Sequence, residues 1–178
     1  MLLGALNVSI HRTVGDETPS FDLESHDAFR TALEFETVRA KFFGQCFAIV
    51  TIRALPHSKN HLQHWSPRIR SLLRPVDRVA LYSRESVEIL LPEIKPEKVD
   101  ELVRLLVEPH DGEAVLVAGI ALFPGMATSP DKLIAESRNA SQQASANVPV
   151  RVANAQTSTT WLAETASEDD NLVTAVSP

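Results

Sequence analysis

The fold is decided by the stretch Leu73-Arg74-Pro75-Val76-Asp77-Arg78-Val79-Ala80-Leu81-Tyr82-Ser83-Arg84-Glu85-Ser86-Val87-Glu88-Ile89-Leu90-Leu91-Pro92-Glu93. Two apolar runs, 79–82 and 87–91, are separated here by the four polar residues 83–86. Two such runs joined by a short polar segment are typical of a β-hairpin. The stretch therefore predicts a hairpin with a polar tip, and its chemistry depends on what that tip carries.

The composition is that of an ordinary globular protein. The chain has 178 residues, of which 44% are hydrophobic and 22% charged, enough for one domain with a full core. Its net charge of −6 argues against direct nucleic-acid binding, because phosphate binding needs clustered Lys and Arg. No apolar run approaches a membrane span, and the apolar start at Met1 lacks the basic segment of a signal peptide. We expect a cytoplasmic protein without membrane contact, and a core position for the single cysteine, Cys46.

Hydrophobic periodicity predicts four helices and five strands. Asp22 or Ser25 is a suitable N-cap for a first helix that ends near Phe43, before Gly44. Its apolar residues at helical spacing share one face, which we expect to be buried: Ala28, Ala32, Phe35, Val38 and Phe42. The other helices are expected at 60–73, where Pro67 should disturb the first half, at 95–108 and at 130–144. Strands are expected at 47–52, 79–82, 87–91, 114–123 and 148–152.

This order predicts an α/β fold, with one mixed, mostly antiparallel sheet flanked by helices. We divide the chain into an arm or linker at 1–20, a domain at 21–153 and a flexible acidic tail at 154–178. In the tail, Trp161-Leu162 is a candidate anchor to the domain or to a partner.

Four segments, in the right order, resemble the GGDEF (diguanylate cyclase) family. Arg74-x-x-Asp77, then the tip and Ile89-Leu90-Leu91-Pro92, is similar to the family's R-x-x-D, signature and L-L-P pattern. Asp22-Leu23 followed by Phe29 resembles the start of the family's domain. Gly119 to Pro124, then Asp131 to Ile134, resembles a later G-I-A-x-x-P and E-L-L segment. The resemblance covers about residues 22–146 and implies the palm fold of nucleotidyl cyclases in a bacterial signalling protein.

The chemistry of that family does not carry over to these residues. The five signature positions hold Ser83, Arg84, Glu85, Ser86 and Val87. Both glycines that let backbone approach phosphates are absent, and Ser86 stands where the family has a metal-binding acid. The other metal acid corresponds to Arg53, give or take one position, and the phosphate-binding lysine corresponds to Ser145. Because Mg²⁺ takes carboxylate oxygens, we expect no metal, no cofactor and no cyclase activity.

The segment that leads into the hairpin, unlike the tip, keeps the residues of the family pattern. In the family, the step corresponding to Arg74-x-x-Asp77 is an inhibitory site that binds cyclic di-GMP. An arginine can bind a guanine edge or a phosphate bidentately, and a carboxylate can accept guanine N–H groups. The alternative is structural: an arginine that ends a helix and an aspartate that shapes the turn before the hairpin.

Three further clusters suggest weaker hypotheses. His57, His61 and His64 have the spacing of one helical face, which suits either a metal site or a solvated surface. Ser83 and Ser86 have no His and acid nearby in the sequence to support a hydrolase. A local basic cluster either attracts an anionic ligand or an acidic partner, or is neutralised in surface pairs: Arg68, Arg70, Arg74, Arg78 and Arg84.

These observations lead to three hypotheses about function. The first is a non-catalytic signalling domain derived from a diguanylate cyclase, which acts through a protein partner or self-association. The second is a cyclic di-GMP receptor that uses Arg74 and Asp77. The third, an active nucleotide cyclase, has the least support.

Overall fold

The computed structural model describes residues 23–56, 62–125, 127 and 129–153, and in this part it contains the predicted helices and strands in the predicted order. They are α1 (His26–Phe43), β1 (Phe47–Ala54), α2 (Leu62–Leu72), β2 (Arg78–Ser83), β3 (Ser86–Leu91), α3 (Pro96–Leu106), β4 (Leu116–Phe123), α4 (Pro130–Gln143) and β5 (Val150–Val152). The hairpin prediction is confirmed, since β2 and β3 pair antiparallel around the polar tip.

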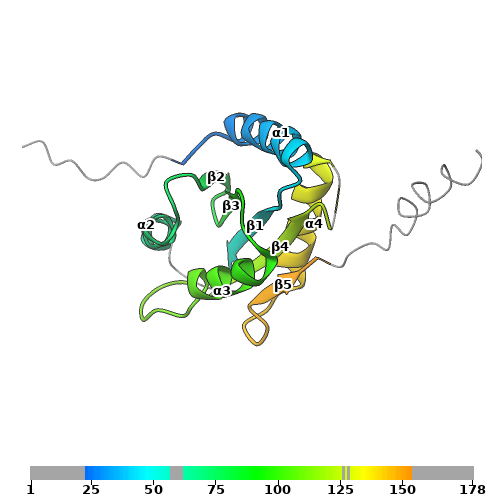
Figure 1. The fold of residues 1–178 in the computed structure, drawn as a ribbon. Helices are drawn as coiled ribbons and strands as arrows, with labels where there is room; N and C mark the ends of the chain where they lie inside the picture. The colour runs from blue at the N-terminus through cyan, green and yellow to red at the C-terminus, as the bar shows by residue number, and fades with distance from the viewer. Residues whose placement is uncertain (1–22, 57–61, 126, 128, 154–178) are drawn as a thin grey trace, which may run out of the picture.

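The strands form one sheet in the order β2-β3-β1-β4-β5 (Figure 1). Strand β1 lies at the centre and pairs antiparallel with both β3 and β4. The short edge strand β5 is parallel to β4, so the sheet is mixed and mostly antiparallel, as predicted.

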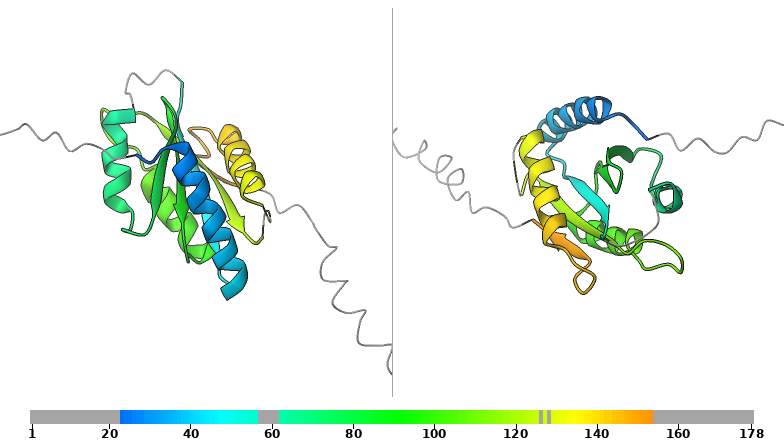
Figure 2. Two further views of the ribbon diagram at one scale, coloured as in Figure 1. Left: turned by 90° about the horizontal axis from the view of Figure 1, so that it is seen from above. Right: turned by 180° about the vertical axis from the view of Figure 1, so that it is seen from behind.

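Helices cover both faces of the sheet, with α2 and α3 on one side and α1 and α4 on the other (Figure 2). Alternate residues of a strand point to opposite faces, and the central strand therefore feeds two hydrophobic clusters. Val50 and Ile52 pack in the cluster that includes Trp65 of α2. Phe47 and Ile49 pack in the cluster that includes Phe29 of α1. A strand covered on both faces is mostly apolar, which explains why Thr51 and Arg53 are the only polar residues of β1.

The ends of α1 follow the sequence, but its predicted buried face is wrong. Ser25 is the N-cap, and its Oγ accepts the Ala28 N–H at 3.2 Å. Gly44 ends the helix with a φ of 64°, a conformation that glycine adopts without strain. Phe35 and Phe42 are 74% and 81% exposed. The buried side consists instead of Phe29, Leu33, Glu36, Thr37 and Ala40.

Polar residues lie on the buried side of α1 because each has a partner close at hand. The Thr37 hydroxyl donates to the Leu33 carbonyl at 2.8 Å, and Glu36 accepts two hydrogen bonds from Arg39. A buried polar group costs little when it is hydrogen-bonded. The larger apolar residues therefore did not identify the face that meets the sheet.

The other helices agree better with their predicted faces. Helix α2 buries Trp65 and Ile69 and continues through Pro67, so the expected disturbance is wrong, and Leu72 is more exposed than predicted. Helix α3 buries Val99, Val103 and Leu106. The predicted inner face of α4 is buried as expected: Leu133, Ser137, Ala140, Ser141 and Ala144.

None of the described helices is long and apolar enough to cross a membrane. The proposed arm at 1–20 and the tail at 154–178, with Trp161 and Leu162, lie outside the described residues. The division of the chain into these parts stays a prediction.

Helix α4 packs directly on β4 at Gly119, with no room for a side chain between them. A Cβ atom built on Gly119 would lie 2.1 Å from both the Ser137 carbonyl oxygen and the Ser141 amide nitrogen. Close by, the hydroxyls of Thr51 in β1 and Ser137 in α4 are 2.8 Å apart. The contact thus holds α4 at a fixed position over the centre of the sheet.

Replacing Gly119 with alanine is expected to lower the free energy of unfolding by about 3 kcal/mol, because backbone atoms of α4 would have to move. Urea denaturation of Gly119→Ala measures the change. Gly125→Ala is the matched control, because nothing lies within 4 Å of a Cβ there. Equal stability of the two variants would contradict the tight contact.

Candidate functional site

The hairpin tip is closed by its two serines. Ser83 and Ser86 hydroxyl oxygens lie 2.6 Å apart, and the Glu85 N–H donates to Ser83 Oγ at 3.2 Å. Arg84 and Glu85 form the exposed turn, and neither has a positive φ. This turn therefore needs no glycine, and hydroxyl groups take the hydrogen bonds inside it. Val87, the last of the five signature positions, is buried in the core.

Arg53 and Ser86 lie directly opposite one another in the pairing of β1 with β3. The structure thus brings together the two positions that the sequence comparison singled out. The Arg53 guanidinium turns to the end of α4, where it donates to the carbonyls of Ser141 at 3.0 Å and Ala144 at 3.2 Å. A cation at a helix C-terminus satisfies carbonyls that have no partner within the helix. Ser145, the position at which the family resemblance calls for a phosphate-binding lysine, is exposed just beyond this helix end.

A buried ion pair next to the tip was missed by the sequence analysis. Glu88 in β3 is fully buried, and its Oε1 accepts from Arg138 Nε of α4 at 2.6 Å. The Arg138 guanidinium also lies over the Tyr82 ring, 3.7 Å from its centre. His26 Nδ1 is 3.6 Å from the other carboxylate oxygen. The one signal in the sequence was a lone acid within the apolar run 87–91.

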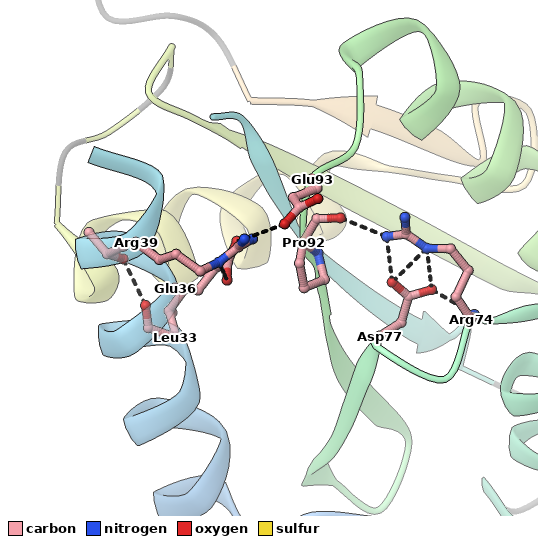
Figure 3. A network of polar contacts seen from close by, with 8 residues as sticks. Leu33, Glu36, Arg39, Arg74, Asp77, Pro92 and Glu93 are labelled. Atoms are coloured by element: carbon pink, nitrogen blue, oxygen red, sulfur yellow. Dashed lines mark hydrogen bonds and ion pairs between the residues drawn. The ribbon is translucent and has the colours of Figure 1, made fainter. Parts of the chain in front are cut away.

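Arg74 and Asp77 bind one another (Figure 3). Asp77 Oδ1 accepts from Arg74 Nη2 at 2.7 Å, and Oδ2 accepts the Arg74 backbone N–H at 2.7 Å. The Asp77 side chain is fully buried, so both of its carboxylate oxygens are occupied within the turn. This hydrogen bonding to Asp77 raises the pKa of Arg74 above its usual value. The arrangement matches the structural interpretation of this step.

The same arginine also ties the turn to the end of the hairpin. Arg74 Nη2 donates to the Pro92 carbonyl at 2.7 Å. From the other side, Arg39 of α1 pairs with Glu93 and with Glu36 (Figure 3). These bonds, first the one to Glu36, raise the pKa of Arg39. The segment that leaves β3 is therefore held by two guanidinium groups, one from the lead-in and one from α1.

Two hollows border Arg74. One, of about 600 Å³, lies between α1 and the base of the hairpin and is lined in part by Arg39, Arg74 and Arg78. The other, of about 470 Å³, lies toward α3 and is lined in part by Lys95 and Lys98. The arginines of the first hollow are all paired with acids: Arg39 with Glu36 and Glu93, Arg74 with Asp77, and Arg78 with Glu24. Its charge is thus largely neutralised before any ligand arrives.

The remaining clusters of the sequence analysis are mostly accounted for by local pairs. Arg68 pairs with Glu113 and Arg70 donates to the Asp77 carbonyl, while Arg84 is exposed at the tip. His64 is exposed on α2, and His57 and His61 lie outside the described residues. Cys46 is half-buried just before β1, so its predicted core position is only partly reached.

The comparison with solved structures identifies the fold. The GGDEF domain of YfiN from Pseudomonas aeruginosa superposes with a TM-score of 0.61 at 22% identity, over 76% of this chain and 93% of that one. An active GGEEF domain of a diguanylate cyclase from Vibrio cholerae gives 0.65 at 14% identity, over 75% and 99% of the two chains. The GGDEF domain of DgcB from Caulobacter crescentus, solved with cyclic di-GMP, gives 0.59 at 16%, over 74% and 91%.

The sequence itself matches no protein-family model, and a comparison with curated proteins found no match. The chain thus has the fold of GGDEF domains, a palm-like mixed sheet flanked by helices.

Removing the Asp77 carboxylate is expected to lower the free energy of unfolding by about 2 kcal/mol, because the Arg74 amide and guanidinium lose a buried acceptor. Urea denaturation of Asp77→Ala measures this. Asp100→Ala, which breaks a solvent-exposed pair with Arg104, is the control and should change stability little. Equal effects would contradict the structural role of the turn.

Proposed function

We propose that this chain is a non-catalytic regulatory domain, built on the GGDEF fold of bacterial cyclic di-GMP signalling, that acts by binding protein. The fold likeness supports the relation to cyclases. The absence of enzyme activity is argued from the groups present around the hairpin tip, and protein binding from the apolar surface of α1.

The observation that carries the proposal is the facing pair of Arg53 and Ser86. At the corresponding positions, the family resemblance calls for two acids that hold Mg²⁺. A guanidinium and a hydroxyl do not fit that ion, since Mg²⁺ requires hard oxygen ligands with at least one carboxylate and is repelled by a cation. The nearest buried carboxylate, Glu88, is already paired with Arg138.

The tip also lacks the means to hold a triphosphate. Phosphoryl transfer depends on metal ions and on close backbone contacts that position and neutralise the phosphates. Here the two glycine positions hold Ser83 and Arg84, and the Ala54 N–H donates to the Glu85 carbonyl at 2.9 Å. The Glu85 carbonyl is thus hydrogen-bonded to β1 and not to a ligand.

We expect no cyclic di-GMP and no other cyclic nucleotide from GTP with Mg²⁺ or Mn²⁺, because neither metal nor phosphate has a site at the tip. Chromatography of long incubations at high protein concentration measures the product. An active GGDEF domain under the same conditions is the positive control. Product that grows with protein concentration, and that is lost in Arg53→Ala, would overturn the proposal.

A second candidate, a cyclic di-GMP receptor, is favoured by one observation. Arg74 is 44% exposed at the side chain and borders both hollows, and within the described residues its Nη1 donates no recorded hydrogen bond. Against it stands the Asp77 carboxylate, which is buried and already bonded to Arg74. A ligand would have to displace those bonds in order to use both side chains.

Calorimetric titration with cyclic di-GMP separates the two candidates. We expect no saturable heat, because the guanine-binding carboxylate is occupied. Saturable binding that is lost in Arg74→Ala and kept in Arg84→Ala would establish the receptor in place of the first candidate. Arg84 is a fair control because it is an exposed arginine of the same hairpin.

A further inference from the structure

The outward face of α1 carries an unusual amount of exposed apolar surface. Phe35, Val38 and Phe42 are 74%, 68% and 81% exposed. Figure 2 shows α1 at the outside of the domain, with its carboxyl end extending past the sheet. Contiguous apolar patches on a folded protein usually mark an interaction site, because their exposure to water is costly.

These residues form a stripe with the spacing of a helix-pairing seam. Ala28, Phe35 and Phe42 are seven residues apart, and Val38 lies between the last two. A repeat of alternating three and four residues keeps one stripe of an α-helix in line with a second helix. The stripe lies on the side of α1 opposite to the buried residues Phe29 and Leu33. The stripe is therefore not an uncovered part of the domain core.

The charges beside the stripe are complementary to a second copy of the same helix. Glu34 and Lys41 each precede an aromatic residue of the stripe by one position, so both lie on the same flank. Consider an antiparallel pair in which Phe35 packs against Val38 of the other copy. The flank that carries Glu34 and Lys41 then lies beside the same flank of the other helix. Glu34 of each copy then comes nearest to Lys41 of the other, and the contact occurs twice by symmetry.

The neighbouring side chains favour this antiparallel arrangement over a parallel one. In a parallel pair Glu34 would meet Arg39 of the other copy, but Arg39 is already held by Glu36 and Glu93. Lys41 is exposed, and no bond to it is recorded among the described residues. Glu34 has only a loose pair with Arg30, at 3.6 Å between two exposed side chains.

We propose that a second copy of this chain docks on α1, with the two helices antiparallel and the stripe Phe35, Val38 and Phe42 at the centre of a symmetric dimer. The inference rests on the protein-binding role proposed above and names its partner. Each copy presents the same patch, so the interface closes on itself and yields a dimer rather than a filament.

The mass of the full chain in solution tests the dimer. Sedimentation and light scattering over a dilution series should show twice the chain mass of 19.6 kDa at high concentration. Phe42→Glu should give a monomer with an unchanged thermal melt, because Phe42 makes no core contact. Leu105→Glu is the control, an exposed apolar residue on α3 that should leave the dimer intact. A wild-type monomer, or a dimer that survives Phe42→Glu, overturns the proposal.

Charge reversal tests the antiparallel pairing. Glu34→Lys and Lys41→Glu alone should each weaken self-association by roughly tenfold, because like charges then meet at both contacts. A mixture of the two variants should form a heterodimer, and the double variant should regain the wild-type affinity. If only Glu34→Lys has an effect and the mixture gains nothing, the antiparallel arrangement is wrong.

The other occupants of the stripe give different outcomes. If the chain is a monomer that dimerises after residues 154–178 or 1–22 are removed, that segment covers the stripe and the second copy is excluded. If the chain is a monomer but binds another protein through Phe42, self-association is wrong while the interaction role stands. Product from GTP would overturn the non-catalytic role and leave the dimer measurement unaffected.

Discussion

The close contact between α4 and β4 at Gly119 is the constraint on which one whole face of the sheet depends. Without a Cβ at Gly119, the backbone of α4 comes near enough for Ser137 to reach Thr51 of the central strand. The same position brings the last carbonyls of α4 within reach of Arg53 and brings Arg138 to the buried Glu88. A side chain at Gly119 would separate all of these pairs at once.

The two faces of the sheet therefore differ in character. The face under α2 and α3 is mainly apolar, and Arg68 of α2 also donates to the Leu106 carbonyl of α3. The face under α1 and α4 carries a row of polar groups that ends at the hairpin tip, and cations from β1 and α4 occupy it. Buried charges of this kind persist only when they are paired. The buried acid beside the tip, Glu88, is thus bonded to Arg138, and Arg53 and Ser86 stand where the resemblance calls for metal-binding acids, which is the physical basis of the proposed regulatory role.

Helix α1 shows what hydrophobic periodicity can predict and what it cannot. Its sequence has two apolar stripes, one with the larger aromatic residues Phe35 and Phe42 and one with Phe29 and Leu33. The spacing predicts that each stripe shares a face, but it does not say which face meets the sheet. That choice depends on Thr37 and Glu36, whose hydrogen bonds to Leu33 and Arg39 allow them to be buried. The stripe with Phe35 and Phe42 therefore faces away from the sheet and is exposed.

The sequence by itself determined the order of the elements, the hairpin and a tip without glycine, because these depend on residue type and on short spacing. It also placed Arg74 and Asp77 three residues apart in one turn. Only the tertiary structure decided that this pair is closed on itself, that Arg53 meets Ser86 and caps α4, and that Glu88 is buried against Arg138. Most of those contacts join residues more than thirty positions apart. They depend on how closely the helices pack on the sheet, and this distance cannot be predicted from short-range sequence patterns.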